Sequence, residues 1–562
     1  MSTASYFDFH FHPAFKQFIT VFDEPRSSQR KAAEIRQEMD LRNAVLDFLD
    51  ENMLHILESQ CSYNQMHRGG VKLGIANIIA IEHGIADGRN LIGKVLRSDL
   101  TRPMDPALLQ SIRKGQTSYY ALFKKELEMY RILSDVNDGA LVEILTRKAP
   151  VQFDQNKFYL AIGMEGGHNL SRYFIAQPGK PEFSGDATKD HRDVVSSFHA
   201  LFHELWNRNM DLFYITLTHM SFIPEQHLAN HAYGMKLLKH PAFMPIRSGL
   251  HEDGKKLVSA AYDMQMHGVQ TPVLIDIKHM SLKSRLDFYE YRNSNGYSDI
   301  PIIATHMGVT GYSIAEWTAA LEEHGLVKQD GLQGVSVVTE RKPAGEWGKL
   351  LNKEFTFNPW SINLMDEDII EILRSGGLIG MSLDVRILGY EPMIKLKKAE
   401  AEEFFSVAEF RHFFPHLQLP PSAAEPEPLT ESELIPTKKE RHPICLCLNI
   451  IHILSVAAWN KDIIGNNMQD AWDHICIGSD FDGLIDPVKI CRDASQMPAL
   501  EQNIFRWLPV AETAYRKVNE GPAVLPRSNN TIDLAALRQC AQKIMFGNGK
   551  RLVENWLLGK LR

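Results

Sequence analysis

The sequence is poor in cysteine and has no closely paired cysteine motif of the CxxC type. Its 562 residues include six cysteines, and no two of them are separated by two residues. This excludes a zinc ribbon, a thioredoxin-type redox motif and a small disulfide-stapled fold. We expect reduced thiols in a cytoplasmic protein, because disulfides are rare in reducing compartments. The six are Cys61, Cys445, Cys447, Cys476, Cys491 and Cys540.

The sequence also has no surplus of positive charge and no long hydrophobic run, and we expect no signal peptide. Lysine and arginine number 61 against 69 acidic residues, a formal net charge of −8. Because nucleic-acid-binding proteins carry a basic surplus, no nucleic-acid partner is expected. The opening MSTASYFDFHFHP has neither a basic start nor an apolar core. The run Ile444–Trp459 is too short to span a bilayer. We interpret it as a buried helix and expect no membrane anchor.

What is present is a regular alternation of short apolar runs with helical patterns. The runs are apolar throughout rather than at alternate positions, as strands buried on both faces are. Helical patterns include Ser28–Gln60, Gly254–Met266 and Asp366–Arg374. The runs are Phe7–Phe11, Val71–Ile81, Phe158–Met164, Leu212–Leu217, Val273–Ile277, Ile302–Thr305, Leu378–Met381 and Ile475–Gly478. This alternation predicts an α/β fold, a (β/α)8 TIM-type barrel. An open doubly wound sheet would give the same pattern.

Long inserts interrupt the alternation near residues 84–157, 311–360 and 390–443. We predict one domain over residues 1–562 that carries them as inserted loops and helices. The last insert begins with a predicted amphipathic helix, Glu391–Phe414. It continues into Pro420–Pro443, which is predicted to be a loop because proline interrupts helices and central strands.

Histidine and carboxylate side chains gather directly after these runs. His10 and His12 lie two residues apart on the first run, so both can point to one side. One HxH pair is expected by chance among 23 histidines. Five further runs end in His, Asp or Glu, however, and the carboxyl ends of barrel strands meet at one mouth. The residues that follow these five runs are Glu165, His219, His279, His306 and Asp480.

Imidazoles and carboxylates together favour zinc or a similar divalent ion. Two ligand groups, His10 with His12 and His279 with His306, predict two metal ions joined by a bridging carboxylate. Paired ions ~3.5–4 Å apart can activate a water between them, and a metal lowers the pKa of water from ~15.7 towards ~7. The predicted chemistry is attack by a metal-bound hydroxide, with Asp480 as the proton shuttle.

These stretches resemble the renal (membrane) dipeptidase family of the amidohydrolase superfamily. The motifs with the highest specificity are MEGGH at Met164–His168 and HICIGSDFDG at His474–Gly483. The others are YITLTH, GLHEDGKKLVSAAYDM followed by LIDIKHMS, IATHM and the tail FGNGKRLVENW, all in the family's order. The resemblance implies a TIM-type barrel with a binuclear zinc site that hydrolyses a dipeptide or other small amide, in a protein that can form a homodimer.

The resemblance also implies a role for each residue. His10 and His12 are the first-strand ligands, and Glu165 bridges the metals. His279 and His306 bind the second ion. Asp480 is a metal-site residue and the catalytic acid or base. His219 contacts the substrate carbonyl and stabilises the oxyanion.

The sequence departs from the family pattern at several positions. The usual His-x-Asp of the first strand is His-x-His, which removes one negative charge at His12. Lys278 replaces a small polar residue; it could bind a substrate carboxylate, become a carboxylated bridging ligand, or extend away from the site. The arginine expected after the sixth strand has no clear counterpart, and Arg341 or Lys342 could replace it. Together with the inserts, these departures weaken the dipeptide prediction more than the prediction of metal hydrolysis.

Two further interpretations stay open. The same metal site could hydrolyse a lactone, a phosphoester or another non-peptide, because one fold hosts many substrates. Alternatively, the barrel could be a catalytically silent binding protein. Buried imidazoles and carboxylates without a metal would carry a desolvation cost, which disfavours the silent barrel.

Overall fold

The computed structural model describes most of the chain. The residues described are 4–21, 33–41, 57–87, 103–136, 141–149, 151–154, 156–175, 193–234, 240–324, 326–330, 334–346, 354–389, 402–419, 443–464 and 471–561.

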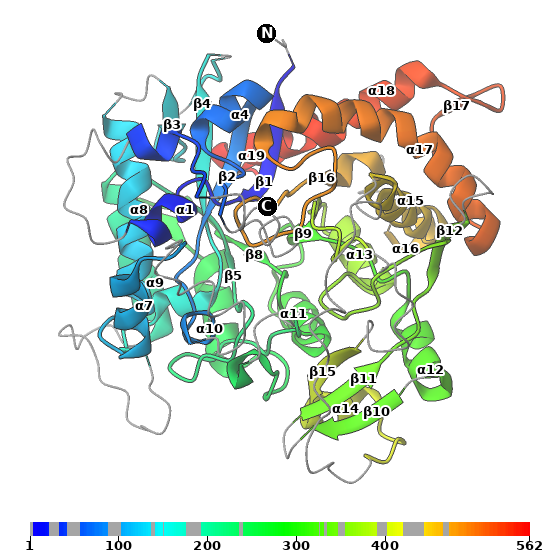
Figure 1. Cartoon of the computed structure of the whole chain (residues 1–562), viewed down its shortest axis with the longest axis horizontal. Coiled ribbons are helices and arrows are strands. Elements are labelled where there is room, and N and C mark those ends of the chain that lie inside the picture. Colours follow the sequence, from blue (N-terminus) through cyan, green and yellow to red (C-terminus); the bar gives the residue numbers. More distant parts are fainter. Residues whose placement is uncertain are drawn as a thin grey trace.

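Eight parallel strands form the central sheet, and each coincides with one predicted run. The strands, in order around the sheet, are β1 (Tyr6–Phe11), β2 (Val71–Ile78), β4 (Phe158–Met164), β5 (Leu212–Thr216), β8 (Leu274–Asp276), β9 (Ile303–Met307), β14 (Leu378–Met381) and β16 (Ile475–Ile477). Two backbone hydrogen bonds join the ends of this order: His12 N–H donates to the Phe481 carbonyl at 3.0 Å, and Asp480 N–H donates to the His10 carbonyl at 2.8 Å. The prediction of a TIM-type barrel is confirmed, and the open sheet is excluded (Figure 1).

Burial on both faces explains the continuous apolar runs. Every residue of β1, β4, β5 and β9 is buried. Side chains on one face fill the barrel, and those on the other lie under helices, so neither face selects polar residues. A short strand, β3 (Val142–Ile144), adds to the start of β4 outside the barrel order. Polar side chains are therefore concentrated at the carboxyl ends of the barrel strands.

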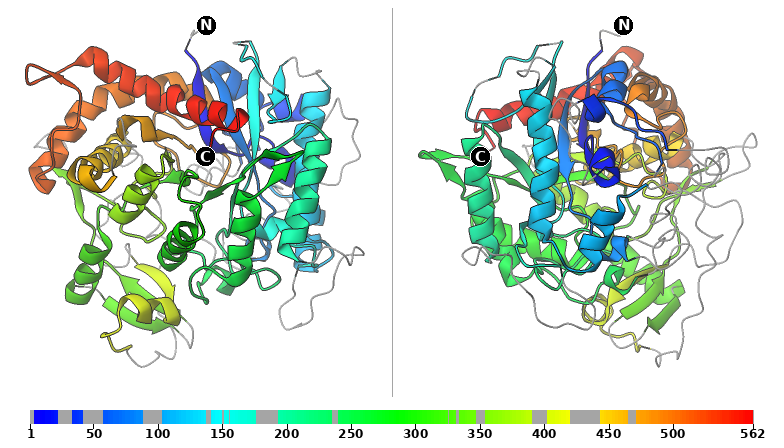
Figure 2. Two further views of the ribbon diagram at one scale, coloured as in Figure 1. Left: turned by 180° about the vertical axis from the view of Figure 1, so that it is seen from behind. Right: turned by 60° about the vertical axis from the view of Figure 1, so that its left-hand side comes forward.

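Helices surround the barrel, and several begin at a side-chain cap. The side chains of Ser118, Asp193 and Ser281 each accept a hydrogen bond from a backbone N–H of the first turn. The helices are α1 (Phe15–Thr20), α4 (Tyr63–Gly69), α5 (His83–Ala86), α7 (Pro106–Arg113), α8 (Tyr119–Asp135), α9 (Val194–Asn207), α10 (Glu252–Tyr262), α11 (Leu282–Ser294), α12 (Ile314–His324), α13 (Asp366–Arg374), α14 (Val407–Phe413), α15 (Ile444–Trp459), α16 (Lys461–Ile464), α17 (Met497–Asn519), α18 (Leu534–Gln542) and α19 (Asn548–Leu557). Figure 2 shows the C-terminal helices, orange to red, along one side of the barrel.

The predicted helices compare as follows. Asp366–Arg374 is α13 residue for residue, and Gly254–Met266 corresponds to α10, which ends at Tyr262. Ser28–Gln60 lies mostly outside the described residues. Ile444–Trp459 is the buried helix α15, as predicted, and it packs against α13 and α17. No helix in the described ranges is long and apolar enough to cross a membrane.

The predicted helix Glu391–Phe414 is wrong over part of its length. Residues Glu402–Ser406 form strand β15, and only Val407–Phe413 are helical, as α14. The strand pairs antiparallel with β11 (Gly334–Val338), which also pairs with β10 (Leu326–Asp330), in a small separate sheet near α12 (Figure 1). Phe405 packs with Trp317 in the core beneath this sheet, so tertiary pairing decides the local structure. Residues 390–401 and 420–442, including most of the predicted Pro-rich loop, lie outside the described residues.

A buried ion pair connects two helices below the mouth of the barrel. Arg285 on α11 and Asp368 on α13 are both buried, with Nη2 to Oδ2 at 2.9 Å and Nε to Oδ1 at 3.0 Å. Tyr289 donates to the same carboxylate at 2.7 Å, and the guanidinium also donates to the Met280 carbonyl at 2.9 Å. Met280 follows His279, so this pair fixes the backbone at the end of the fifth barrel strand.

We predict that Asp368→Asn destabilises the protein by about 3–5 kcal/mol, because it leaves the buried Arg285 charge without its counter-ion. Urea unfolding measures the change. Arg374→Met is the matched control on the same helix: its partner Glu371 lies at the surface, 2.7 Å away, and such pairs contribute at most about 1 kcal/mol. Equal effects of the two substitutions would contradict a structural role for the buried pair.

Candidate metal centre

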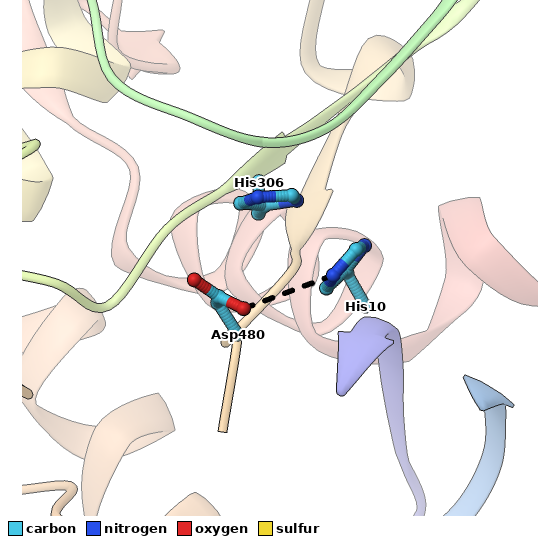
Figure 3. Close-up of side chains that lie close together, drawn as sticks. All are labelled: His10, His306 and Asp480. Atoms are coloured by element: carbon cyan, nitrogen blue, oxygen red, sulfur yellow. Dashed lines mark ion pairs between the residues drawn. The ribbon is translucent and has the colours of Figure 1, made fainter. Parts of the chain in front are cut away.

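The predicted site residues lie together at the carboxyl ends of the barrel strands. Glu165, His219, His279, His306 and Asp480 each lie at the end of, or shortly after, a different barrel strand. His10 and His12 lie on and directly after β1, and Lys278 directly precedes His279. Figure 3 shows His10, His306 and Asp480 facing one another. The carboxylate of Glu165 lies within ion-pair distance of five imidazoles, those of His10, His12, His219, His279 and His306.

Glu165 is the centre of this cluster. Its Oε1 lies 3.0 Å from Nε2 of His279 and 3.4 Å from Nε2 of His10. Its Oε2 faces Nε2 of His12 at 3.3 Å. Burial would raise the pKa of Glu165, but the imidazoles of His10 and His219 outweigh burial and hold it well below its usual value. The carboxylate is therefore ionised and presents its two oxygens to different histidines, which is the geometry that bridging needs.

The glycine after Glu165 permits this arrangement. Gly166 has φ of +91°, a conformation that other residues rarely adopt, and a Cβ there would lie 2.3 Å from Nδ1 of His168. Its N–H donates to the Thr216 hydroxyl on β5. The MEGGH motif thus turns the chain sharply at the strand end and leaves the Glu165 side chain aimed across the mouth.

His10 is oriented by the strands on the other side of the barrel. Its Nδ1 lies 2.8 Å from the Tyr214 hydroxyl and 3.1 Å from the Thr305 hydroxyl. Its Nε2 is buried and makes no hydrogen bond of normal geometry within the described part of the chain. Partners on Nδ1 fix the tautomer and orientation that a metal-binding Nε2 requires.

Asp480 completes the group around the first strand. Its Oδ1 lies 3.7 Å from Nε2 of His10 and 3.6 Å from Nε2 of His12. Its backbone is in the left-handed region, with φ of +63°. Burial would lower the pKa of His12, but the facing carboxylates of Asp480 and Glu165 outweigh burial and raise it to about 10. Without a cation, a proton therefore stays on His12 between the two carboxylates.

The pKa values of His279 and His306 are shifted in the direction opposite to that of His12. Burial, together with neighbouring positive groups, lowers the pKa of both rings well below the usual value. Neutral imidazoles are the form that binds metals. The Thr305 hydroxyl lies 3.0 Å from Nδ1 of His306, while His279 has φ of +67°, and its carbonyl accepts from Ala232 N–H at 2.8 Å.

His219 is paired with Glu82, a residue that the sequence analysis missed. Nδ1 of His219 lies 3.0 Å from Oε1 of Glu82, which is fully buried and also accepts from Met220 N–H at 3.2 Å. Burial would raise the pKa of Glu82, but the facing His219 holds it at about 2. Glu82 follows β2 in the same way that the other site residues follow their strands, so its position after the second run was the available signal.

Lys278 is buried beside the cluster, with 1% of its surface exposed. Burial lowers its pKa to about 8, against the influence of Asp480, Asp276, Glu165 and Asp384. The proposed replacements for the missing arginine lie elsewhere. Lys342 pairs with Glu316 at 3.1 Å, and the Arg341 guanidinium donates to the Phe357 carbonyl at 3.4 Å.

The donor atoms fit a divalent cation. Three overlapping groups each have their ligand atoms within 4.8 Å of one another. They are His10 with His306 and Asp480, His10 with His12 and Glu165, and Glu165 with His219 and His279. Buried Nε2 atoms that lack hydrogen-bond partners, next to ionised carboxylates, are the donor set of zinc and similar ions. The group around His279 contains His219, whereas the sequence analysis assigned His306 to that ion and His219 to the substrate; these individual roles stay predictions.

No family model matches the chain, and no curated protein matches it. Solved structures with a similar fold include a metallopeptidase from Rhodobacter sphaeroides bound to a phosphinate mimic of the dipeptide L-Ala-D-Ala. That structure has 13% identity, a TM-score of 0.41, and coverage of 92% of this chain and 97% of its own. An amidohydrolase from Pseudomonas aeruginosa has 11% identity, a TM-score of 0.38, and coverage of 94% and 99%. Likenesses at this level leave the chemistry to be judged from the side chains of the cluster.

We predict that the metal-free protein binds Zn²⁺ through Glu165. At a free Zn²⁺ concentration of 100 times Kd, binding to the folded state alone adds about 2.7 kcal/mol of stability. Differential scanning fluorimetry should show a rise in melting temperature that Glu165→Gln abolishes. Glu554→Gln, in a surface pair with Lys550, is the control and should keep the rise. An unchanged rise in the Glu165 variant would remove this residue from the metal centre.

Proposed function

We propose that the protein is a metal-dependent hydrolase that cleaves the amide bond of a dipeptide or a similarly small amide. The convergence of five imidazoles on the ionised Glu165 carboxylate is the observation that carries this proposal. The resemblance of the MEGGH and HICIGSDFDG motifs to the renal dipeptidase family favours an amide as the substrate. We further propose zinc as the metal and two ions per chain, because Glu165 directs its two oxygens to different histidines.

Bound divalent cations would supply a water with a pKa lowered towards ~7. Asp480 is placed to take the proton from that water and to give it to the leaving amine. The Asp480 side chain keeps 13% of its surface exposed, more than the side chains of His10 and His12. It therefore faces the space that a substrate would enter. General acid–base catalysis of this kind contributes about 10²–10⁴-fold.

His219 is suited to stabilise the substrate oxygen that becomes negative. Glu82 accepts the Nδ1–H of His219 at 3.0 Å and leaves Nε2 directed towards the cluster, 3.7 Å from Oε1 of Glu165. Burial would lower the pKa of His219, but the Glu82 and Glu165 carboxylates outweigh it and raise the pKa. A second proton on the ring is thereby favoured, and an Nε2–H donor next to the developing charge lowers the barrier.

Lys278 is proposed to bind the free carboxylate of the substrate. In the described part of the chain its Nζ forms no ion pair, although its charge is influenced by four nearby carboxylates. An ammonium group held in a buried, anionic mouth is a point charge able to receive a substrate carboxylate. The substrate class that follows is a small amide with a free C-terminal carboxylate.

We predict that Asp480→Asn retains its metal but loses turnover by about 10²–10⁴-fold, because the amide cannot accept the proton. Elemental analysis and kcat on one protein sample measure both. Asp462→Asn, in the short helix α16, is the control and should keep both. Retained turnover would exclude Asp480 as the proton acceptor.

We predict that Lys278→Met mainly raises KM for dipeptides with a free carboxylate, as loss of ground-state binding does. The same dipeptides with an amidated C-terminus are the matched substrates, and their kinetics should be unchanged by the substitution. A collapsed kcat at unchanged KM would contradict carboxylate recognition by Lys278.

A panel of dipeptides, N-acyl amino acids, lactones and phosphoesters separates the other functions. Turnover of a lactone or phosphoester alone would replace the amide proposal with the non-peptide one. A protein that binds no divalent metal and turns over nothing would be the silent barrel. Cytoplasmic location and a homodimer remain predictions from the sequence.

A further inference from the structure

A buried carboxyl group lies behind the first-strand histidines. Glu126, on α8, is completely buried, and neither of its carboxylate oxygens forms a hydrogen bond of normal geometry in the described part of the chain. Leaving such a group without a partner costs several kcal/mol unless the group has a function or a nearby counter-charge. Glu126 therefore requires an explanation that packing alone does not give.

His12 is the positively charged neighbour that acts on Glu126. Burial raises the pKa of Glu126 to about 8, and the charge of the His12 ring and the backbone N–H of Ile79 oppose this rise, His12 more strongly. The two side chains are not within ion-pair distance of each other. Helix α8 is nevertheless held against the segment that carries His12, because the Tyr130 hydroxyl, one turn beyond Glu126, accepts from Ala14 N–H at 3.2 Å.

The Nδ1 side of the His12 ring is also without a hydrogen-bond partner. Its Nδ1 is buried and makes no hydrogen bond in the described part of the chain. Three of the neighbouring rings differ: Nδ1 of His10 faces Tyr214, Nδ1 of His219 faces Glu82, and Nδ1 of His306 faces Thr305. In each of these three, a group behind the ring leaves Nε2 free to face the cluster. Nδ1 of His279, like that of His12, is buried and makes no hydrogen bond within the described residues. His12 lacks such a group at direct hydrogen-bond distance, and Glu126 is a buried carboxyl group without a partner on the helix that contacts Ala14, two residues from His12.

We propose that Glu126 is the positioning carboxylate of His12, which it reaches through one bridging water on Nδ1. A carboxylate behind a ligating imidazole fixes the tautomer and raises the basicity of the ligand. In the metal-free protein burial keeps Glu126 mostly protonated. A cation held by His12 would favour its ionised form, which would then supply, behind the metal ligands, the negative charge that is lost where His12 stands in place of an aspartate. The inference rests on the proposed metal-dependent function, but it concerns metal affinity and can fail independently.

The test is a double-mutant cycle on metal affinity. Loss of an outer partner of this kind typically weakens metal binding about 10–100-fold. We predict a loss in this range for Glu126→Gln, measured as the Zn²⁺ dissociation constant by competition with a chromophoric chelator. The visible spectrum of the Co²⁺-loaded protein should also change, because the ligand field at His12 is altered. Glu126→Asp should recover part of the affinity.

The cycle is completed in a His12→Asp background. With an aspartate at position 12 there is no Nδ1 to orient, and Glu126 adds only a repulsive charge, so Glu126→Gln should no longer weaken Zn²⁺ binding. Glu512→Gln, a buried carboxylate on α17 paired with Arg527, controls for the general effect of removing a buried charge and should leave Zn²⁺ affinity unchanged. Melting temperatures of the metal-free variants identify any that fail to fold.

The outcomes separate the two proposals. Glu126 variants with wild-type Zn²⁺ affinity and Co²⁺ spectrum, or with losses that simply add to that of His12→Asp, would overturn the inference while leaving the metal centre intact. A wild-type protein that binds neither ion would instead overturn the proposed function.

Discussion

The parallel contact between the first and last strands of the barrel is the constraint on which the candidate site depends. The hydrogen bonds between Asp480 and His10 and between His12 and Phe481 are made by backbone atoms, so they also fix where the side chains of these residues lie. The same junction is locked by Asp8, which accepts from the Ser479 N–H at 2.9 Å across 471 positions of sequence. A small change of register there would move His12 and Asp480 away from Glu165 together. The geometry of the site is thus a property of barrel closure more than of any loop.

The charges of the buried side chains at the mouth of the barrel must also be balanced. Protons and cations compete for the same place, because the ionised Glu165 carboxylate and Asp480 hold a proton on His12, whereas His279 and His306 are kept neutral by burial. Bringing so many polar groups out of water is costly unless a strong charge compensates for it. A divalent cation among neutral imidazoles and ionised carboxylates provides that compensation. Lys278 is a further buried titratable group in the same region, where it is influenced by four nearby carboxylates.

Much of the fold could be predicted because its signals are local. Strands buried on both faces are apolar throughout, which identified all eight barrel strands, and the polar residues that follow them identified the members of the cluster. The partners behind the cluster were not predictable in this way. Tyr214 lies within an apolar run, and Glu126 lies in the middle of a helix in an insert, where a glutamate normally faces water. The pattern of β15 predicts a helix, because its two phenylalanines are compatible with either periodicity, and only pairing with β11 makes this segment a strand.

The distance along the chain between the two halves of the mouth has a consequence for biosynthesis. A ribosome that adds ~5–20 residues per second needs roughly half a minute or more to pass from His10 to Asp480. During that time the two imidazoles of the first strand belong to an incomplete barrel that still lacks its last strand. The set of side chains at the mouth is therefore complete only late in synthesis, after Asp480 has been added.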